Sequence, residues 1–100
     1  MVTVVAIVNI RAGQASEYEA ALQQAAPLIA AVPGYMGHEL LKCQDTPGRY
    51  LLLEHWQSRE AHLIGFRQSP GYAEWKRLTH PFYDPFPTVE HYEACLQFPA

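Results

Sequence analysis

Apolar residues in this chain gather in short continuous runs and in longer segments where they recur every third or fourth position. The runs are rich in β-branched and aromatic residues and are bounded by turn-forming residues, which is typical of strands. They predict four strands, at residues 2–10, 35–43, 49–56 and 88–95. The Asp45-Thr46-Pro47-Gly48 sequence has the proline and glycine of a tight reversal, so the second and third strands should form a hairpin.

A helix is predicted between the first two strands. Ser16-Glu17-Tyr18-Glu19 has the form of a capping box, in which the serine and the second glutamate satisfy backbone donors at a helix start. An apolar stripe follows at helical spacing, made of Tyr18, Leu22, Ala25, Ile29 and Val32. Pro27 should kink or break this helix because it removes an internal hydrogen bond, and Pro33-Gly34 should end it.

Two shorter helices are predicted after the third strand. Ser58 should cap a helix that runs to about Arg67, and Ser69-Pro70 should start the next one with serine as cap and proline at the first position. The inward stripe of that second helix is Tyr72, Trp75, Leu78, Thr79 and Phe82. Residues 81–87 hold three prolines among aromatic residues, which predicts an extended connection.

The order of elements is β-α-β-β-α-β, the ferredoxin-like α+β plan, in which helices cover one face of an antiparallel sheet. One hundred residues suffice for one core, so we expect a single domain over residues 1–100. The first strand is apolar on both sides, with Val5 and Ile7 on the side opposite Val4 and Val8. A sheet face that helices do not cover needs another cover, and we expect a homodimer packed sheet to sheet.

Composition and charge narrow the function classes. The chain is 49% apolar with a net charge of −3, and its seven Lys and Arg residues form no patch that would follow phosphates, so no nucleic-acid partner is expected. The apolar N-terminal run is too short to span a bilayer and has no signal-peptide features, which predicts a cytoplasmic protein without a membrane partner. Cys43 and Cys95 lack metal-site spacing and are expected to be free, buried thiols on strands, and no metal site is predicted.

A set of short motifs, taken in order, resembles a known family. They are Pro33-Gly34-Tyr35, Glu39-Leu40, Pro47-Gly48-Arg49-Tyr50, Glu54-x-Trp56 and Ser69-Pro70-x-Tyr72. Their order and spacing resemble the antibiotic biosynthesis monooxygenase (ABM) family of dimeric α+β barrels over nearly the whole chain. The resemblance implies a small homodimer with an apolar pocket between helices and sheet in each protomer.

The resemblance also bears on chemistry. Characterised relatives oxidise phenols, quinols or anthrones with O2 and no metal or flavin, whereas others degrade haem or isomerise small molecules, so the fold alone does not fix the function. Haem-degrading relatives carry a tryptophan and a histidine where this chain has Phe66 and Lys76, which disfavours haem. Many quinol-oxidising relatives carry histidines where Phe66 and Gly71 stand.

Cofactor-free oxygenation needs a base, an apolar cage and donors for an oxyanion, and histidine is the natural base near neutral pH. His62 could face the pocket from the first short helix or be a solvated helix residue. His80 could enter the pocket mouth or complement the helix dipole. His55 should face the dimer interface, and structural roles are favoured for His38 and His91.

Other polar and aromatic residues are candidates for the pocket wall. Glu54 shares a face with Trp56 and would by default form an ion pair with Arg49, Arg67 or Arg77, the alternative being a proton-handling carboxylate with a raised pKa. The candidate substrate-binding residues are Trp56, Phe66, Arg67, Tyr72, Trp75 and Tyr83, although aromatic residues at helical spacing also form cores.

The sequence therefore predicts a cofactor-independent monooxygenase that oxidises a small phenolic, quinol or anthrone-like molecule, with no cofactor. In this hypothesis His62 or His80 takes the phenolic proton, and Tyr83 or Arg67 stabilises the oxyanion. Two alternatives are open: a non-catalytic dimer that binds a small ligand or serves as an interaction module, and an isomerase or degradative enzyme of the same fold.

Overall fold

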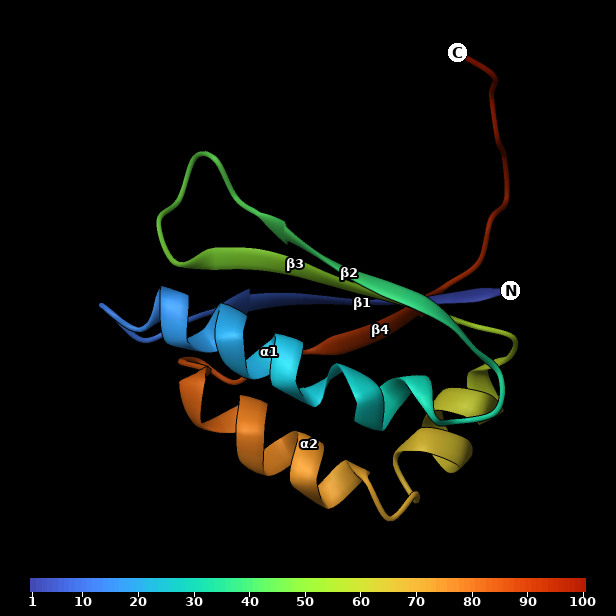
Figure 1. The fold of residues 1–100 in the computed structure, drawn as a ribbon. Coiled ribbons are helices and arrows are strands. Elements are labelled where there is room, and N and C mark those ends of the chain that lie inside the picture. The colour runs from blue at the N-terminus through green and yellow to red at the C-terminus, as the bar shows by residue number, and fades with distance from the viewer.

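The computed structural model describes residues 1–100 and contains one antiparallel sheet with helices on one face, as Figure 1 shows. The strands are β1 (Val2–Asn9), β2 (Tyr35–Lys42), β3 (Arg49–Trp56) and β4 (Val89–Tyr92), and the helices are α1 (Ala15–Ala30), η1 (Ala61–Phe66), α2 (Tyr72–Thr79) and η2 (His80–Phe82). The strand order is β2-β3-β1-β4. The predicted α+β fold is confirmed.

The inner face of the sheet carries the core. Val4 pairs with Glu54, Ala6 with Leu52 and Val8 with Tyr50, and all six side chains are buried beneath the helices. The helices contribute buried residues at the expected stripe positions of α1, namely Tyr18, Leu22, Ala25 and Ile29, together with Val32 just beyond it. The alternation along β3 therefore points one polar residue, Glu54, into an otherwise apolar layer.

The outer face of the sheet has no helix on it (Figure 1). One part of this face is an exposed apolar patch. Ile7 is 57% exposed and Leu41 is 45% exposed, and Leu51 lies between them because it pairs with both. A contiguous exposed patch of this kind is unusual on a monomer unless something docks there.

The start of α1 differs from the prediction, and of the two outcomes expected at Pro27 a break is not observed. The helix begins at Ala15 after Gln14, with no side-chain cap, so Ser16-Glu17-Tyr18-Glu19 does not form a capping box. Glu19 instead accepts a hydrogen bond from the Tyr50 hydroxyl and pairs with Lys42 at 3.3 Å, because these groups on the sheet compete for its carboxylate. Pro27 does not break the helix, which continues to Ala30. Only one turn follows the proline, and burial of Ile29 stabilises that turn.

The first short helix starts where the sequence predicts, but its geometry differs. The Ser58 hydroxyl accepts the Ala61 N–H at 3.1 Å. The following turn is a π-helix, in which the Arg67 N–H donates to the His62 carbonyl at 3.0 Å. The wider turn brings His62 and Phe66 to the inner side, where both are buried.

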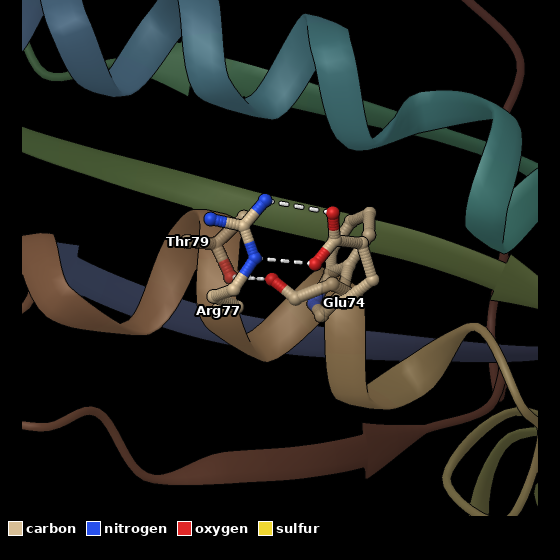
Figure 2. A network of polar contacts seen from close by, with 4 residues as sticks. Glu74, Arg77 and Thr79 are labelled. Atoms are coloured by element: carbon tan, nitrogen blue, oxygen red, sulfur yellow. Dashed lines mark hydrogen bonds and ion pairs between the residues drawn. The ribbon is translucent and has the colours of Figure 1, made fainter.

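The start of α2 also differs from the prediction. The helix begins at Tyr72, whose N–H donates to the Ser69 carbonyl, and the Ser69 hydroxyl is buried without a partner rather than acting as a cap. Figure 2 shows polar contacts along α2: Arg77 donates to both oxygens of Glu74 at 2.5 and 2.7 Å. The buried Thr79 hydroxyl donates to the Trp75 carbonyl at 2.9 Å, so it needs no partner in the core (Figure 2).

The chain end and the cysteines depart from expectation too. Strand β4 stops at Tyr92, and the residues after it leave the sheet as an exposed tail (Figure 1). Cys95 lies on this tail and is exposed, while Cys43 follows β2 and is half-buried. Both thiols are free, but neither is buried, because each lies beyond the end of a strand rather than within it.

A glycine in the turn before β2 gives a first test of the fold. Gly34 has φ +90°, and a Cβ there would lie 2.8 Å from the Ala61 Cβ. We expect Gly34→Ala to lower the free energy of unfolding by more than about 1 kcal/mol, because it adds strain and a clash. Gly13→Ala is the matched control, since Gly13 has φ +78° and no atom lies within 4 Å of the place that a Cβ would take. Urea unfolding of both variants should show the larger loss for Gly34→Ala, and equal losses would contradict the role of the clash.

Candidate active site

A cavity of about 160 Å³ lies between the inner face of the sheet and the helices η1 and α2. Its floor is apolar and is formed by Val4, Ala6, Val8 and Leu52. Its polar wall groups are Glu54, His62, Arg67, Tyr72, His80 and Tyr83. An apolar cavity with a few convergent polar groups is the usual form of a small-molecule site.

Seven of the eight residues predicted for the site line this cavity. They are His62, Phe66, Arg67, Tyr72, Trp75, His80 and Tyr83. Trp56 does not line it: its fully buried ring stacks on Phe66 with centroids 5.6 Å apart, and its Nε1–H donates to Glu54 Oε1 at 3.1 Å. Trp56 thus orients two lining residues from behind the cavity wall.

Glu54 is the most unusual group in the cavity. The expected ion pair with arginine is absent: Arg49 donates to Asn9, Arg77 pairs with Glu74, and Arg67 lies too far away for a salt bridge. Burial therefore raises the pKa of the Glu54 carboxyl to about 7, with the Trp56 N–H and the charge of Arg67 opposing the rise. A carboxyl that titrates near neutral pH can both accept and return a proton.

His62 faces Glu54 across the cavity wall. Its Nε2 lies 3.8 Å from Glu54 Oε1, and its Nδ1 lies 2.8 Å from Nε2 of His91 on β4. Burial, with the charges of Arg67 and His91, lowers the pKa of His62 to about 3. The imidazole is therefore neutral at neutral pH and is a weaker proton acceptor than the Glu54 carboxylate.

His80 enters the cavity from the other side, at the junction of α2 and η2. Its ring lies against Phe86, with centroids 4.9 Å apart, and against Tyr83, with centroids 5.7 Å apart. Burial and the charges of Lys76 and Arg67 lower the pKa of His80, so it is neutral at pH 7. His62 and His80 thus line one cavity.

Tyr83 and Arg67 supply hydrogen-bond donors to the cavity. The Tyr83 hydroxyl lies 3.0 Å from the Tyr18 hydroxyl, and burial raises the pKa of both phenols, which keeps them protonated. Arg67 is exposed and is the cation among the lining residues. The site therefore combines a titrating carboxyl and neutral imidazoles with hydroxyl and guanidinium donors.

The predicted catalytic and substrate-binding residues do not include Glu54, for which a proton-handling role is only the alternative to an ion pair, or His91, for which a structural role is favoured. The parity of β3 placed Glu54 on the same face as Trp56 and Tyr50, and this signal could have assigned Glu54 to the cavity. His91 had no comparable signal, because its contact with His62 joins residues 29 positions apart.

A second, more open groove of about 340 Å³ lies between α1 and β2. Its charged groups include Glu19 and Lys42, which pair with each other, and none of the predicted site residues lines it. No group of three or more His, Cys, Asp or Glu side chains is placed to hold a metal ion. None of the helices has the length and apolar character needed to cross a membrane.

Comparisons with known proteins identify the family. The sequence model described as antibiotic biosynthesis monooxygenase matches residues 1–78. The uncharacterised protein YczJ of Bacillus subtilis (strain 168) is 48% identical over 93 residues, covering 93% of this chain and 98% of that protein. A putative antibiotic biosynthesis monooxygenase from Bordetella bronchiseptica has a similar structure, with a TM-score of 0.90, 29% identity, and coverage of 95% of this chain and 97% of that one.

A further similar structure is that of SnoaB, a cofactor-independent oxygenase from Streptomyces nogalater. Its TM-score is 0.80 at 24% identity, with 99% of this chain and 97% of that one covered, a likeness that speaks for the fold. The motif order, the sheet with helices on one face, and the match over residues 1–78 agree: this chain belongs to the antibiotic biosynthesis monooxygenase family.

Proposed function

We propose that this protein is a cofactor-independent monooxygenase that oxidises a small phenolic or quinol-like molecule with O2. The observation that carries the proposal is Glu54, a buried carboxyl without an arginine partner, facing an apolar cavity with a pKa near neutrality. The family membership and the shared fold with a cofactor-independent oxygenase support the same reaction class.

The reaction would begin with removal of a proton from the substrate by the Glu54 carboxylate. The electron-rich anion passes one electron to O2, and the resulting radical pair combines to form a C–O bond and a peroxide anion. Return of the proton gives a hydroperoxide, whose O–O bond breaks with loss of water to leave a carbonyl. In sum the substrate gains one oxygen atom and loses two hydrogens, and the second oxygen atom leaves as water.

The remaining wall groups have roles that follow from their charge state. Arg67 and the Tyr83 hydroxyl would stabilise the anion, since one is cationic and the other stays protonated. His80, neutral at pH 7, is the second base in reach of the cavity. His62 would orient the Glu54 carboxyl and exchange protons with it. It would not hold an extra proton itself, because its pKa is about 3.

Cavity size sharpens the substrate class. An apolar cavity of about 150 Å³ in another protein is large enough for benzene. The cavity here, about 160 Å³, therefore fits a single aromatic ring better than the three fused rings of an anthrone. We infer that monocyclic phenols and hydroquinones are the preferred substrates.

The test is an oxygen-electrode assay with a panel of phenols, hydroquinones and anthrones, with metal and flavin content measured on the same sample. We expect stoichiometric O2 uptake with monocyclic hydroquinones, without bound metal or flavin. Ligand binding without O2 uptake would indicate a binding module, and turnover that survives anaerobic conditions would indicate an isomerase or degradative enzyme. Either result would refute the proposed function.

We further infer that the protein is a homodimer whose protomers pack through the outer sheet face, around Ile7, Leu41 and Leu51. The exposed apolar patch described above supports this arrangement. A two-fold interface presents each residue twice, so a single charge introduced there acts twice.

This arrangement predicts different effects for two equally exposed isoleucines. Ile7 on the outer sheet face and Ile64 on η1 are both 57% exposed. Ile7→Lys should weaken the dimer by at least about 100-fold in Kd, since it buries an unpaired charge at the interface centre. Ile64→Lys should leave the mass unchanged in light scattering and sedimentation. Equal masses for wild type and both variants would contradict the proposed interface.

A further inference from the structure

Two histidines connect the candidate active site to the protein surface. His62 lines the inner cavity, and its side chain is 4% exposed. His91, on the edge strand β4, lies with its Nε2 2.8 Å from the His62 Nδ1 and borders a separate outer hollow with Val2 and Arg59. The groups Glu54, His62 and His91 therefore follow one another from the cavity to the outer hollow, with a hydrogen-bond distance between the two histidines and a separation of 3.8 Å between His62 and Glu54.

The spacing along this line suits proton transfer. The two imidazoles are already at hydrogen-bond distance, and the His62 Nε2 lies 3.8 Å from the Glu54 carboxylate. A shift of about 1 Å closes this gap to a hydrogen bond, and catalytic hydrogen bonds commonly tighten when substrate binds. A neutral imidazole has one donor and one acceptor nitrogen, so it can take a proton on one side and release one on the other.

Burial, together with the surrounding positive charges, disfavours a stable proton on either imidazole ring. Burial and the positive charges nearby lower the pKa of both His62 and His91. The titratable and charged groups that face the line are Tyr18, Tyr35, His38, Arg67, Tyr72 and Tyr83 around Glu54, and Arg59, Arg67 and Glu93 around His91. The site thus disfavours a stable imidazolium, as a relay requires.

We propose that His62 and His91 form a proton relay that carries the substrate proton from Glu54 to the outer hollow and later returns it. This inference rests on the proposed function. The protonated Glu54 gives its proton to His62 Nε2, the His62 Nδ1–H passes to His91 Nε2, and the His91 Nδ1–H leaves to solvent. When the peroxide anion needs a proton, the same steps run in reverse and restore both tautomers, so no net proton is released.

The first test measures the relay without turnover. In 15N-labelled protein, the ring N–H of His62 should exchange with solvent through His91. His91→Gln keeps a hydrogen-bonding side chain but cannot pass a proton through a ring, so exchange should slow by roughly tenfold or more. Unchanged exchange in this variant would overturn the relay, whether or not the protein consumes O2.

The second test uses turnover and chemical rescue. His91→Ala and His91→Gln should each lower kcat by roughly tenfold in dilute buffer with KM unchanged, and added imidazole should restore His91→Ala toward wild type. A purely structural role predicts full activity for His91→Gln and no rescue of His91→Ala by imidazole, and that result would overturn the relay.

The two tests separate the relay from the proposed function. The relay is supported and the monooxygenase refuted if exchange of the His62 ring N–H with solvent slows in His91→Gln while the wild type takes up no O2 with any compound of the panel. Normal O2 uptake with unchanged exchange supports the monooxygenase and refutes the relay.

Discussion

Replacing Glu54 with glutamine is expected to lower kcat by roughly 10²- to 10⁴-fold, the usual contribution of a general base. Glutamine has nearly the same shape and can still accept the hydrogen bond from the Trp56 Nε1–H. It cannot take up a proton, so the loss should fall on kcat while KM changes little. Steady-state O2 uptake with the best hydroquinone of the panel measures both constants.

Glu74→Gln is the matched control. Glu74 is exposed on α2, faces away from the cavity and pairs with Arg77 at the surface. Its substitution should leave kcat and KM unchanged. Full turnover in Glu54→Gln would assign the base elsewhere, and His80 would be the next group to replace.

The same substitution should change how stability depends on pH. The pKa of Glu54 rises from an ordinary value of 4.5 to about 7 on folding, so the folded protein holds this proton over a range in which the unfolded chain has lost it. The contribution to stability is therefore complete below pH 4.5 and is lost as the pH rises through 7.

Glutamine has no such titration. The stability of wild type relative to Glu54→Gln should fall by about 3 kcal/mol between about pH 4 and about pH 8. His62 titrates in both proteins, so the difference between them isolates Glu54. Parallel urea-unfolding curves at several pH values, at one protomer concentration, provide the measurement. A constant difference would show that Glu54 keeps its ordinary pKa in the folded protein.

Trp56→Ala should have the largest effect on folding, a loss of about 3–5 kcal/mol in the free energy of unfolding. The Trp56 side chain is fully buried, stacks on Phe66 and packs edge-on against Tyr35. Its removal leaves a large cavity and takes away the N–H donor of Glu54, whose buried carboxylate then has one partner fewer. A domain of this size has a total stability of only about 5–15 kcal/mol.

Ile64→Ala provides the comparison. Ile64 is 57% exposed on the π-helix, so its truncation should change stability by no more than about 0.5 kcal/mol. Thermal unfolding followed by circular dichroism avoids the loss of a fluorescent tryptophan. A change below about 1 kcal/mol for Trp56→Ala would mean that the packing around Phe66 relaxes to fill the space.

Much of the fold could be predicted because it follows from local pattern. The sequence predicts a strand over residues 49–56, and β3 has those bounds, because a continuous apolar run follows a turn and precedes a capping serine. The same alternation placed Glu54 and Trp56 on one face. Strand period and turn chemistry are properties of neighbouring residues, so they are visible in the sequence.

Predictions that depended on distant partners were less successful. Ser16 and Glu19 match a capping box, but Glu19 binds Tyr50, which lies 31 positions further along the chain. An ion pair of Glu54 with an arginine is predicted, yet Arg49 and Arg77 have other partners, and Arg67 lines the same cavity without reaching salt-bridge distance. Which buried groups meet depends on the packing of helices over the sheet, and no local pattern encodes that.

The site residues show the same contrast between what local pattern predicts and what depends on long-range packing. Helical spacing could name His62 and His80 as candidates but could not fix the face of the helix from which each projects. The contact between His62 and His91 required the pairing of β4 with β1, the longest-range connection in the sheet. Aromatic spacing could likewise suggest Trp56 as a wall residue, but not that Phe66 would cover it.

The π-turn between Ala61 and Phe66 has a consequence for how such a site can diversify. A π-turn contains one residue more than the α-helical turn it replaces, so it can be gained or lost by a single-residue insertion or deletion. Such an event would rotate every later side chain of the segment by about 100° relative to the sheet while leaving the strands untouched. Relatives with a segment one residue shorter would present different groups to the cavity, and deletion of Leu63 would imitate that step in the laboratory.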